Sequence, residues 1–142
     1  MKRIIIFYML VASSLACQAQ TIAGKWRTID DETGKPKSVV EITERNGKFY
    51  GKIIKLFRAA DEDQNPVCDK CPALDERFKK QIIGMEILKN LIKEDDEFTG
   101  GSILDPNNGK IYRCKVWREG NNLKLRGYLG PFFRTQTWLP EQ

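Results

Sequence analysis

Cys68 and Cys71, separated by two residues, form the pair of side chains with the clearest chemical potential in the chain. Such a pair can act as a redox couple, bind zinc or form a disulfide. A redox couple normally needs a low-pKa thiolate at a helix N-terminus, whereas Pro66 and Pro72 flank this pair and no βαβ pattern surrounds it. Zinc would need Cys114 as a third ligand and a carboxylate or water as the fourth. Redox catalysis and zinc binding are therefore the weaker alternatives.

A disulfide between Cys68 and Cys71 is favoured, because the N-terminal residues indicate export to an oxidising compartment. Closing this short loop would stabilise the folded state by about 2 kcal/mol, and a bridge from either cysteine to Cys114 would stabilise it by about 4 kcal/mol. Proximity in sequence favours the short bridge. Cys114 is then most simply a buried, small apolar residue in a strand.

The chain contains no histidine, which removes Ser-His-Asp and Cys-His catalysis, the commonest metal ligand and the usual base at neutral pH. Neither Ser38 nor Ser102 lies in a nucleophile-elbow pattern. Carboxylates that could pair for acid–base chemistry lie in turns or at strand positions that alternation can expose to water; they are Asp30, Asp31, Glu41, Glu86 and Asp105. We therefore predict no catalytic residue, no metal and no cofactor, with a thiol-redox or hydrolytic enzyme as an alternative.

A third group combines aromatic, basic and amide side chains near the C-terminus. Its members are Tyr112, Trp117, Arg126, Tyr128, Arg134, Gln136 and Trp138. Because side chains alternate along a strand, Arg126 and Tyr128 lie on the same face of one strand. Arg134, Gln136 and Trp138 likewise lie on the same face of the next strand. If these faces line a cavity, they could bind a small apolar or amphipathic ligand. The alternative is a solvated outer face with the leucines of the same strands packed inside.

These side chains need a scaffold, and the strand and turn pattern predicts an all-β domain. Residues 101–139 alternate strands with tight turns at a spacing of about ten residues, which is typical of an antiparallel meander. Asn46 and Gly47 predict a type I′ hairpin. Residues 58–81 break the rhythm, with a possible helical turn at 74–80, and residues 82–91 fit a strand better than a helix. The predicted strands are 22–29, 38–43, 49–57, 82–91, 98–104, 110–117, 123–129 and 133–139.

About eight antiparallel strands in up-and-down order predict a closed barrel, because closure removes exposed sheet edges. Residues 1–19 are predicted to be a signal peptide, with Lys2 and Arg3 before an apolar run too short to span a bilayer of about 30 Å. Residues 20–142 then form a single barrel domain, periplasmic or secreted, with no transmembrane segment. Lipidation at Cys17 is a weaker alternative, because Ser14 stands where a lipoprotein site normally has leucine.

The formal net charge of the full chain is +5, and Lys2 and Arg3 of the predicted signal peptide contribute two of these charges. The remaining basic residues are interspersed along the strands, and no basic block stands out. We therefore expect no nucleic-acid partner. The sequence leaves the oligomeric state open.

An ordered series of motifs runs through nearly the whole chain after the predicted signal peptide. It consists of Gly24-Lys25-Trp26, Tyr50-Gly51-Lys52-Ile53, the Cys68/Cys71 pair, Ile83-Gly84-Met85, Gly101, Ile103-Leu104-Asp105-Pro106, Gly109-Lys110-Ile111-Tyr112, Leu125-Arg126-Gly127-Tyr128 and Phe133-Arg134-Thr135-Gln136-Thr137-Trp138. Together these motifs resemble the bacterial domain-of-unknown-function family 2147, small exported proteins with no established activity. The resemblance implies an exported β domain and transfers no catalytic residue.

Gly24-Lys25-Trp26 also resembles, more distantly, the opening motif of lipocalins. In that family the tryptophan closes one barrel end and an arginine from a late strand packs over it. The resemblance implies that the predicted barrel is lipocalin-like and that Trp26 closes it, with Arg126 and Arg134 as the candidate arginines.

The leading hypothesis is an exported barrel that binds a small ligand or interacts with the cell envelope. The alternative is a protein–protein or surface-adhesion domain, whose barrel would be filled with side chains and would expose Trp117 or Trp138.

Overall fold

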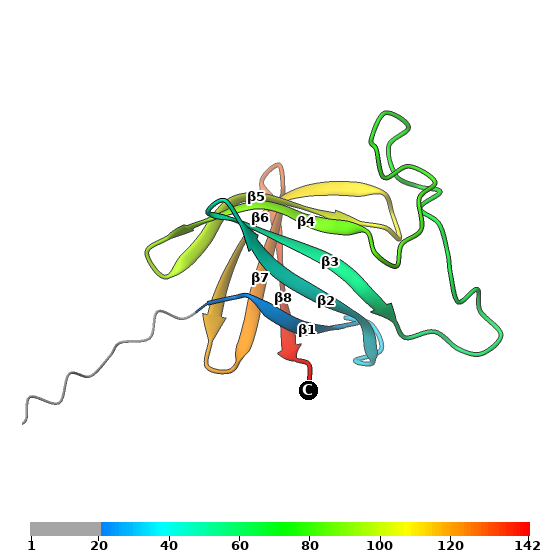
Figure 1. Ribbon diagram of the computed structural model, residues 1–142, viewed down its shortest axis with the longest axis horizontal. Helices are drawn as coiled ribbons and strands as arrows, with labels where there is room; N and C mark the ends of the chain where they lie inside the picture. The colour runs from blue at the N-terminus through cyan, green and yellow to red at the C-terminus, as the bar shows by residue number, and fades with distance from the viewer. Residues whose placement is uncertain (1–20) are drawn as a thin grey trace, which may run out of the picture.

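The eight strands of the protein close into an antiparallel barrel in chain order, as the computed structural model shows for residues 21–142, the part of the chain that it describes (Figure 1). The fold class predicted from the strand and turn pattern is confirmed. No helix occurs among the described residues. The strands are β1 (Gly24–Ile29), β2 (Pro36–Arg45), β3 (Lys48–Leu56), β4 (Glu86–Glu94), β5 (Glu97–Asp105), β6 (Lys110–Glu119), β7 (Asn122–Leu129) and β8 (Phe132–Pro140).

The two ends of the barrel carry different connections. Two-residue turns at 46–47, 95–96 and 120–121 join strands at one end, which we call the closed end. At 46–47 the φ angles of Asn46 and Gly47 are 52° and 78°, the left-handed pair that a type I′ hairpin requires. The opposite end, which we call the open end, carries the loops 30–35, 57–85 and 106–109 and the turn 130–131.

Buried side chains of the core pack together in the half of the barrel toward the closed end, and the core continues under the loop 57–85 at the open end. Phe49 and Phe98 pack edge to face with their ring centroids 4.9 Å apart. Gly51 and Gly101 permit close strand approach, since a Cβ at Gly101 would lie 2.6 Å from the carbonyl oxygen of Lys89. These contacts leave no room for further side chains at those positions.

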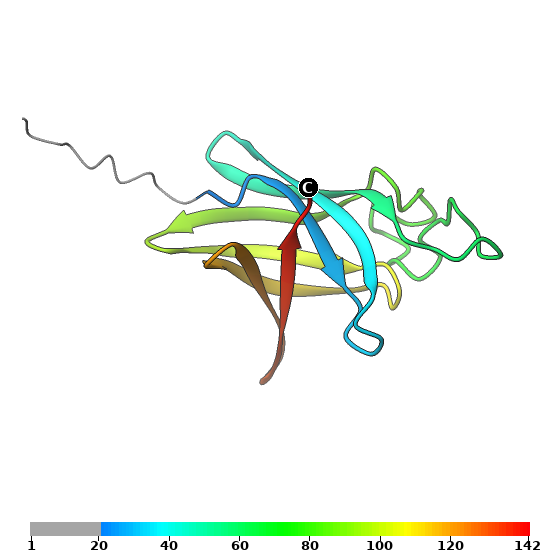
Figure 2. The same ribbon diagram turned by 90° about the horizontal axis from the view of Figure 1, so that it is seen from below.

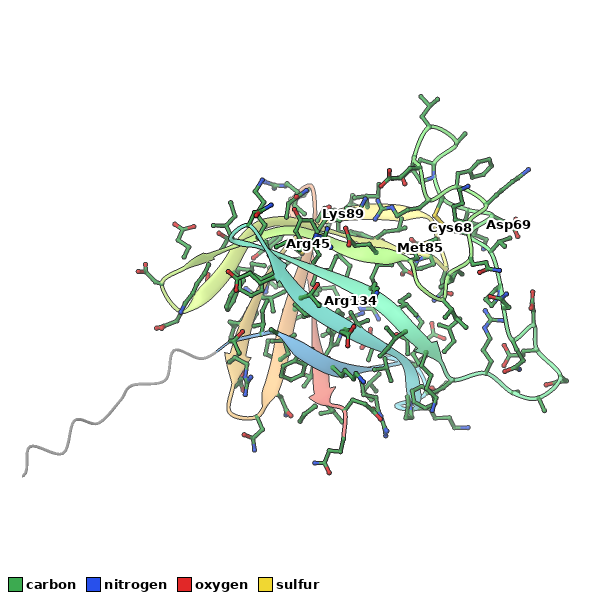
Figure 3. All side chains as sticks on the ribbon, viewed as in Figure 1. Arg45, Cys68, Asp69, Met85, Lys89 and Arg134 are labelled. Carbon is green, nitrogen blue, oxygen red and sulfur yellow. A yellow bond between two sulfur atoms is a disulfide. The ribbon has the colours of Figure 1, made fainter. Side chains whose placement is uncertain are left out.

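The long loop 57–85 is fastened to the barrel. The Cys68–Cys71 disulfide is present and both cysteines are buried, which agrees with the favoured interpretation of the sequence. A Cβ at Gly109 would overlap the carbonyl of Lys70, so this loop packs directly against the turn between β5 and β6. Figure 3 places Cys68 at the end of the barrel away from Arg45.

Two predicted segments differ from the structure. Residues 74–80 form hydrogen-bonded turns rather than a helix, for example with the amide of Phe78 donating to the carbonyl of Asp75 at 3.0 Å. The predicted strand 82–91 begins only at Glu86, because Gly84 has a φ of 91° and the Met85 amide closes a turn onto the carbonyl of Ile82 at 3.1 Å. The predicted signal peptide and Cys17 lie outside the described residues.

Candidate ligand-binding cavity

The open end of the barrel holds a cavity of about 580 Å³. Strands from all around the barrel contribute to its lining, and the 30–32 and 105–108 segments surround its mouth. The apolar wall includes Ile53, Leu56, Ile103, Leu125, Leu129 and Trp138. The cavity therefore combines an apolar interior with a charged and polar rim.

Strand β8 supplies a row of polar groups along the cavity wall. Trp138 is 2% exposed, and its indole Nε1 donates to Oε1 of Gln136 at 3.3 Å. Gln136 in turn donates from Nε2 to Oδ2 of Asp31 at 3.3 Å, and Arg134 forms an ion pair with the same carboxylate. The row links a buried indole to Asp31, which lies in the β1–β2 loop at the mouth.

Other polar groups of the lining are satisfied locally. The hydroxyls of Thr28 and Ser38 are buried and lie 2.6 Å apart, and the hydroxyl of Tyr112 accepts a hydrogen bond from Nδ2 of Asn108 at 3.0 Å. The Asp30 carboxylate accepts hydrogen bonds from the amides of Thr33 and Glu32, which lower its pKa. Asp30 thereby holds the shape of the β1–β2 loop.

The side chains predicted as a ligand-binding group separate into two sets. Tyr112, Arg134, Gln136 and Trp138 line the cavity, whereas Trp117, Arg126 and Tyr128 lie on the outer face of the barrel. The cross-strand register explains the division. Arg134 pairs with Gly127 and Gln136 pairs with Leu125, so the inward face of β8 meets the inward face of β7.

Asp31 and Gly127 are lining residues that the sequence analysis did not propose for the site. Gly127 belongs to the motif Leu125-Arg126-Gly127-Tyr128, and it alternates along β7 with residues of the outer face. Asp31 carried no local signal, since its contact with Arg134 joins the first loop to the last strand.

Trp26 lies toward the opposite end and is 4% exposed. Its indole Nε1 donates to the carbonyl of Ile22 at 2.8 Å. The arginine over its ring is Arg118 of β6, at 5.2 Å from the ring centroid, and not Arg126 or Arg134. Those two lie on the outer face and at the cavity mouth. Alternation along β6 from the buried Cys114 and Val116 would have identified Arg118.

The three cysteines within residues 21–142 offer no reactive thiolate in this arrangement. Burial raises the pKa of the Cys114 thiol to about 12, so this side chain stays neutral at physiological pH. Cys68 and Cys71 are bridged. Within residues 21–142 no three His, Cys, Asp or Glu side chains are grouped to hold a metal ion, and no helix there is long and apolar enough to cross a membrane.

Comparison with known proteins gives two matches. A family model for an uncharacterized protein conserved in bacteria (DUF2147) matches residues 24–139. A solved structure, described as "Protein HP1028 from the human pathogen Helicobacter pylori belongs to the lipocalin family", is 25% identical in sequence and superposes with a TM-score of 0.72. That match covers 86% of this chain and 84% of the other. No curated protein matches the chain.

Proposed function

Since the chain belongs to the DUF2147 family of uncharacterized bacterial proteins, we propose from its own geometry that it binds one small amphipathic molecule at the open end of its barrel. We further propose that it does so after export, in the periplasm or outside the cell. The Cys68–Cys71 bridge supports an oxidising compartment.

The single observation that carries the proposal is the cavity of about 580 Å³ in a barrel whose other half is filled. Small-molecule sites in proteins commonly enclose roughly 300–1,000 Å³ and combine apolar walls with a few placed polar groups. An eight-stranded barrel is wide enough to hold one small ligand. The cavity also favours ligand binding over the adhesion alternative, which requires a filled barrel.

The lining indicates how a ligand would lie. Its apolar body would contact Ile53, Leu125 and Trp138, and its polar end would reach Arg134 and Gln136 near the mouth. The structural relative from H. pylori is described as a member of the lipocalin family, which agrees with a ligand in the barrel.

Gly127 supports the same interpretation. Unlike Gly51 and Gly101, it is not required by a close strand approach, because a Cβ there would meet only Tyr112, at an ordinary 3.5 Å. A glycine inside a strand weakens the strand unless a ligand or backbone comes close. We infer that Gly127 keeps volume free for the ligand beside Arg134.

The test is to fill that volume. Gly127→Leu should lower the affinity for the fluorescent amphiphile 1-anilinonaphthalene-8-sulfonate about tenfold, which corresponds to a modest steric penalty. Ser102→Leu is the matched control, because Ser102 does not line the cavity and pairs with Arg113 on the outer face of β6. Native mass spectrometry of protein purified from its own envelope fraction would then identify a retained ligand.

Equal affinity of Gly127→Leu and wild type for the fluorescent probe would contradict the proposal, as would an equal loss in Ser102→Leu. Thermal melting of both variants checks that each one folds.

A further inference from the structure

The outer face of β6 and β7 concentrates cations and aromatic rings. Arg113, Lys115, Lys124 and Arg126 share this face with Trp117, and Phe133 of β8 adjoins it. We call this surface the cationic face. Within residues 21–142, Arg113, Lys124 and Arg126 form no ion pair, while Lys115 pairs with Glu97 of β5 at 3.2 Å.

The cross-strand register brings like charges together on the cationic face. Lys115 pairs directly with Arg126, an arrangement that is normally destabilising in a sheet. Both cations lie over Trp117, at 5.4 and 5.3 Å from the ring centroid, and Arg126 also lies 4.7 Å from the centre of Phe133. The rings hold both cations in place, and a contact with a ring leaves the positive charge of Arg126 unneutralised.

An exposed apolar tip adjoins the cationic face at the open end. Leu129, Phe132 and Phe133 are 49%, 74% and 63% exposed and surround the 130–131 turn. In Figure 2 the β7–β8 hairpin reaches the lower edge of the molecule. The same residues border the cavity mouth. Large exposed aromatic side chains grouped in this way mark an interaction site.

We propose that the apolar tip and the cationic face dock onto an anionic phospholipid bilayer and bring the cavity mouth to the membrane. Aromatic side chains suit the membrane–water interface, and cations near an anionic surface each contribute about 1 kcal/mol. The acidic side chains of the mouth are those of residues 30–32 in the β1–β2 loop, where Asp31 is paired with Arg134, and of Asp105 at the end of β5. Within residues 21–142, Arg113, Lys124 and Arg126 therefore keep their charges without an ion-pair partner.

A bilayer fits these observations better than a protein partner or a second copy. The cations are spread over the outer side of a sheet, three exposed apolar residues gather at one projecting tip, and both adjoin the mouth of a partly apolar cavity. Docking there would give an amphipathic ligand a path between bilayer and barrel. The proposal goes beyond ligand binding and is tested without any ligand.

The experiment is co-sedimentation of the protein with vesicles of equal parts phosphatidylglycerol and phosphatidylcholine, and with vesicles of phosphatidylcholine alone. The Lys124→Gln/Arg126→Gln double variant should lower the partition coefficient on anionic vesicles about 25-fold, from roughly fivefold for each neutralised cation. Phe132→Ser should lower it about tenfold through lost apolar contact. Binding should also weaken as salt is raised.

Matched controls come from other faces of the barrel. Lys52→Gln removes an exposed cation on β3, and Ile92→Ser removes an apolar side chain on β4 that is 49% exposed. Both should bind anionic vesicles as the wild type does. Affinity of every variant for 1-anilinonaphthalene-8-sulfonate in solution, measured without vesicles, separates a failure of docking from a failure of the ligand cavity.

Absence of wild-type binding to anionic vesicles would overturn the proposal, and so would equal losses in the control variants. A second copy is tested by light scattering. If Phe132→Ser turns a dimer into a monomer while vesicle binding is unchanged, the tip is an interface between copies and the membrane proposal fails.

Discussion

Two buried tryptophans, Trp26 toward the closed end and Trp138 in the wall of the open-end cavity, are held in different ways. The indole of Trp26 donates to a backbone carbonyl at 2.8 Å and is covered by Arg118. The indole of Trp138 donates to the side chain of Gln136, which continues to Asp31 in a loop. A backbone acceptor fixes its donor, whereas a chain of side chains can rearrange around a ligand. On the proposed function, the closed end therefore serves stability, and the open end keeps the adaptable groups.

The largest expected effect comes from removing the closed-end indole. Trp26→Ala should lower the free energy of unfolding by about 3–5 kcal/mol, because a buried aromatic ring is replaced by a void. Urea denaturation measures the loss. Under conditions where the variant remains folded, its affinity for 1-anilinonaphthalene-8-sulfonate should match that of the wild type. A variant that folds normally but loses the probe would reverse the roles assigned to the two ends.

The second effect concerns the long loop at the open end, which is fastened by its own ion pair. The guanidinium of Arg77, 8% exposed, donates two hydrogen bonds of 2.9 Å to Asp75 and lowers the pKa of that carboxyl from 3.8 to about 2. The charged form is thus favoured by folding. The ion pair contributes about 2 kcal/mol to the free energy of unfolding. This contribution is complete above the ordinary pKa of the carboxyl and is lost as the pH falls through about 2.

Asp75→Asn should accordingly lower the free energy of unfolding by about 2 kcal/mol at neutral pH. The difference in this free energy from the wild type should shrink as the pH approaches 2. Urea denaturation across this pH range gives both values. A difference that stays constant with pH would mean that Asp75 acts through packing rather than charge. Such a result would remove the distinction between an electrostatically fastened open end and an apolar closed end.

A smaller effect is expected at Arg118, which covers Trp26. Arg118→Met keeps most of the apolar stem but removes the cation over the ring and the 2.9 Å hydrogen bond to the carbonyl of Thr21. We expect a loss of about 1–2 kcal/mol, measured by urea denaturation. Arg126→Met is the matched control, since that arginine stacks on the half-buried Trp117 and the exposed Phe133 at the outer face. Equal losses in both variants would contradict a special role for the closed end.

The strands and the barrel could be predicted from the sequence because their signals are local. Asn46 and Gly47 specify their hairpin, and the spacing of turns after Gly101 specifies the meander. No local signal, in contrast, predicts which members of the ligand-binding group face the cavity. Alternation assigns Arg126 and Arg134 to faces of their own strands, but closure of the barrel decides which face points inward. The contact of Arg134 with Asp31 likewise depends on the meeting of β8 with the loop after β1.

The smallest effect is the most direct measure of the difference between the two ends. Gly127→Ala adds one methyl group toward the cavity, at a position with an ordinary negative φ and an ordinary contact of 3.5 Å to Tyr112. It should raise the free energy of unfolding by about 0.5 kcal/mol, because alanine loses less backbone entropy on folding. Gly101→Ala should instead lower the free energy of unfolding, since the added Cβ would collide with the backbone of Lys89. If Gly127→Ala is more stable and binds the fluorescent probe more weakly, the open end gives up stability to keep its cavity empty. A destabilised Gly127→Ala would instead make this glycine a packing requirement like Gly101.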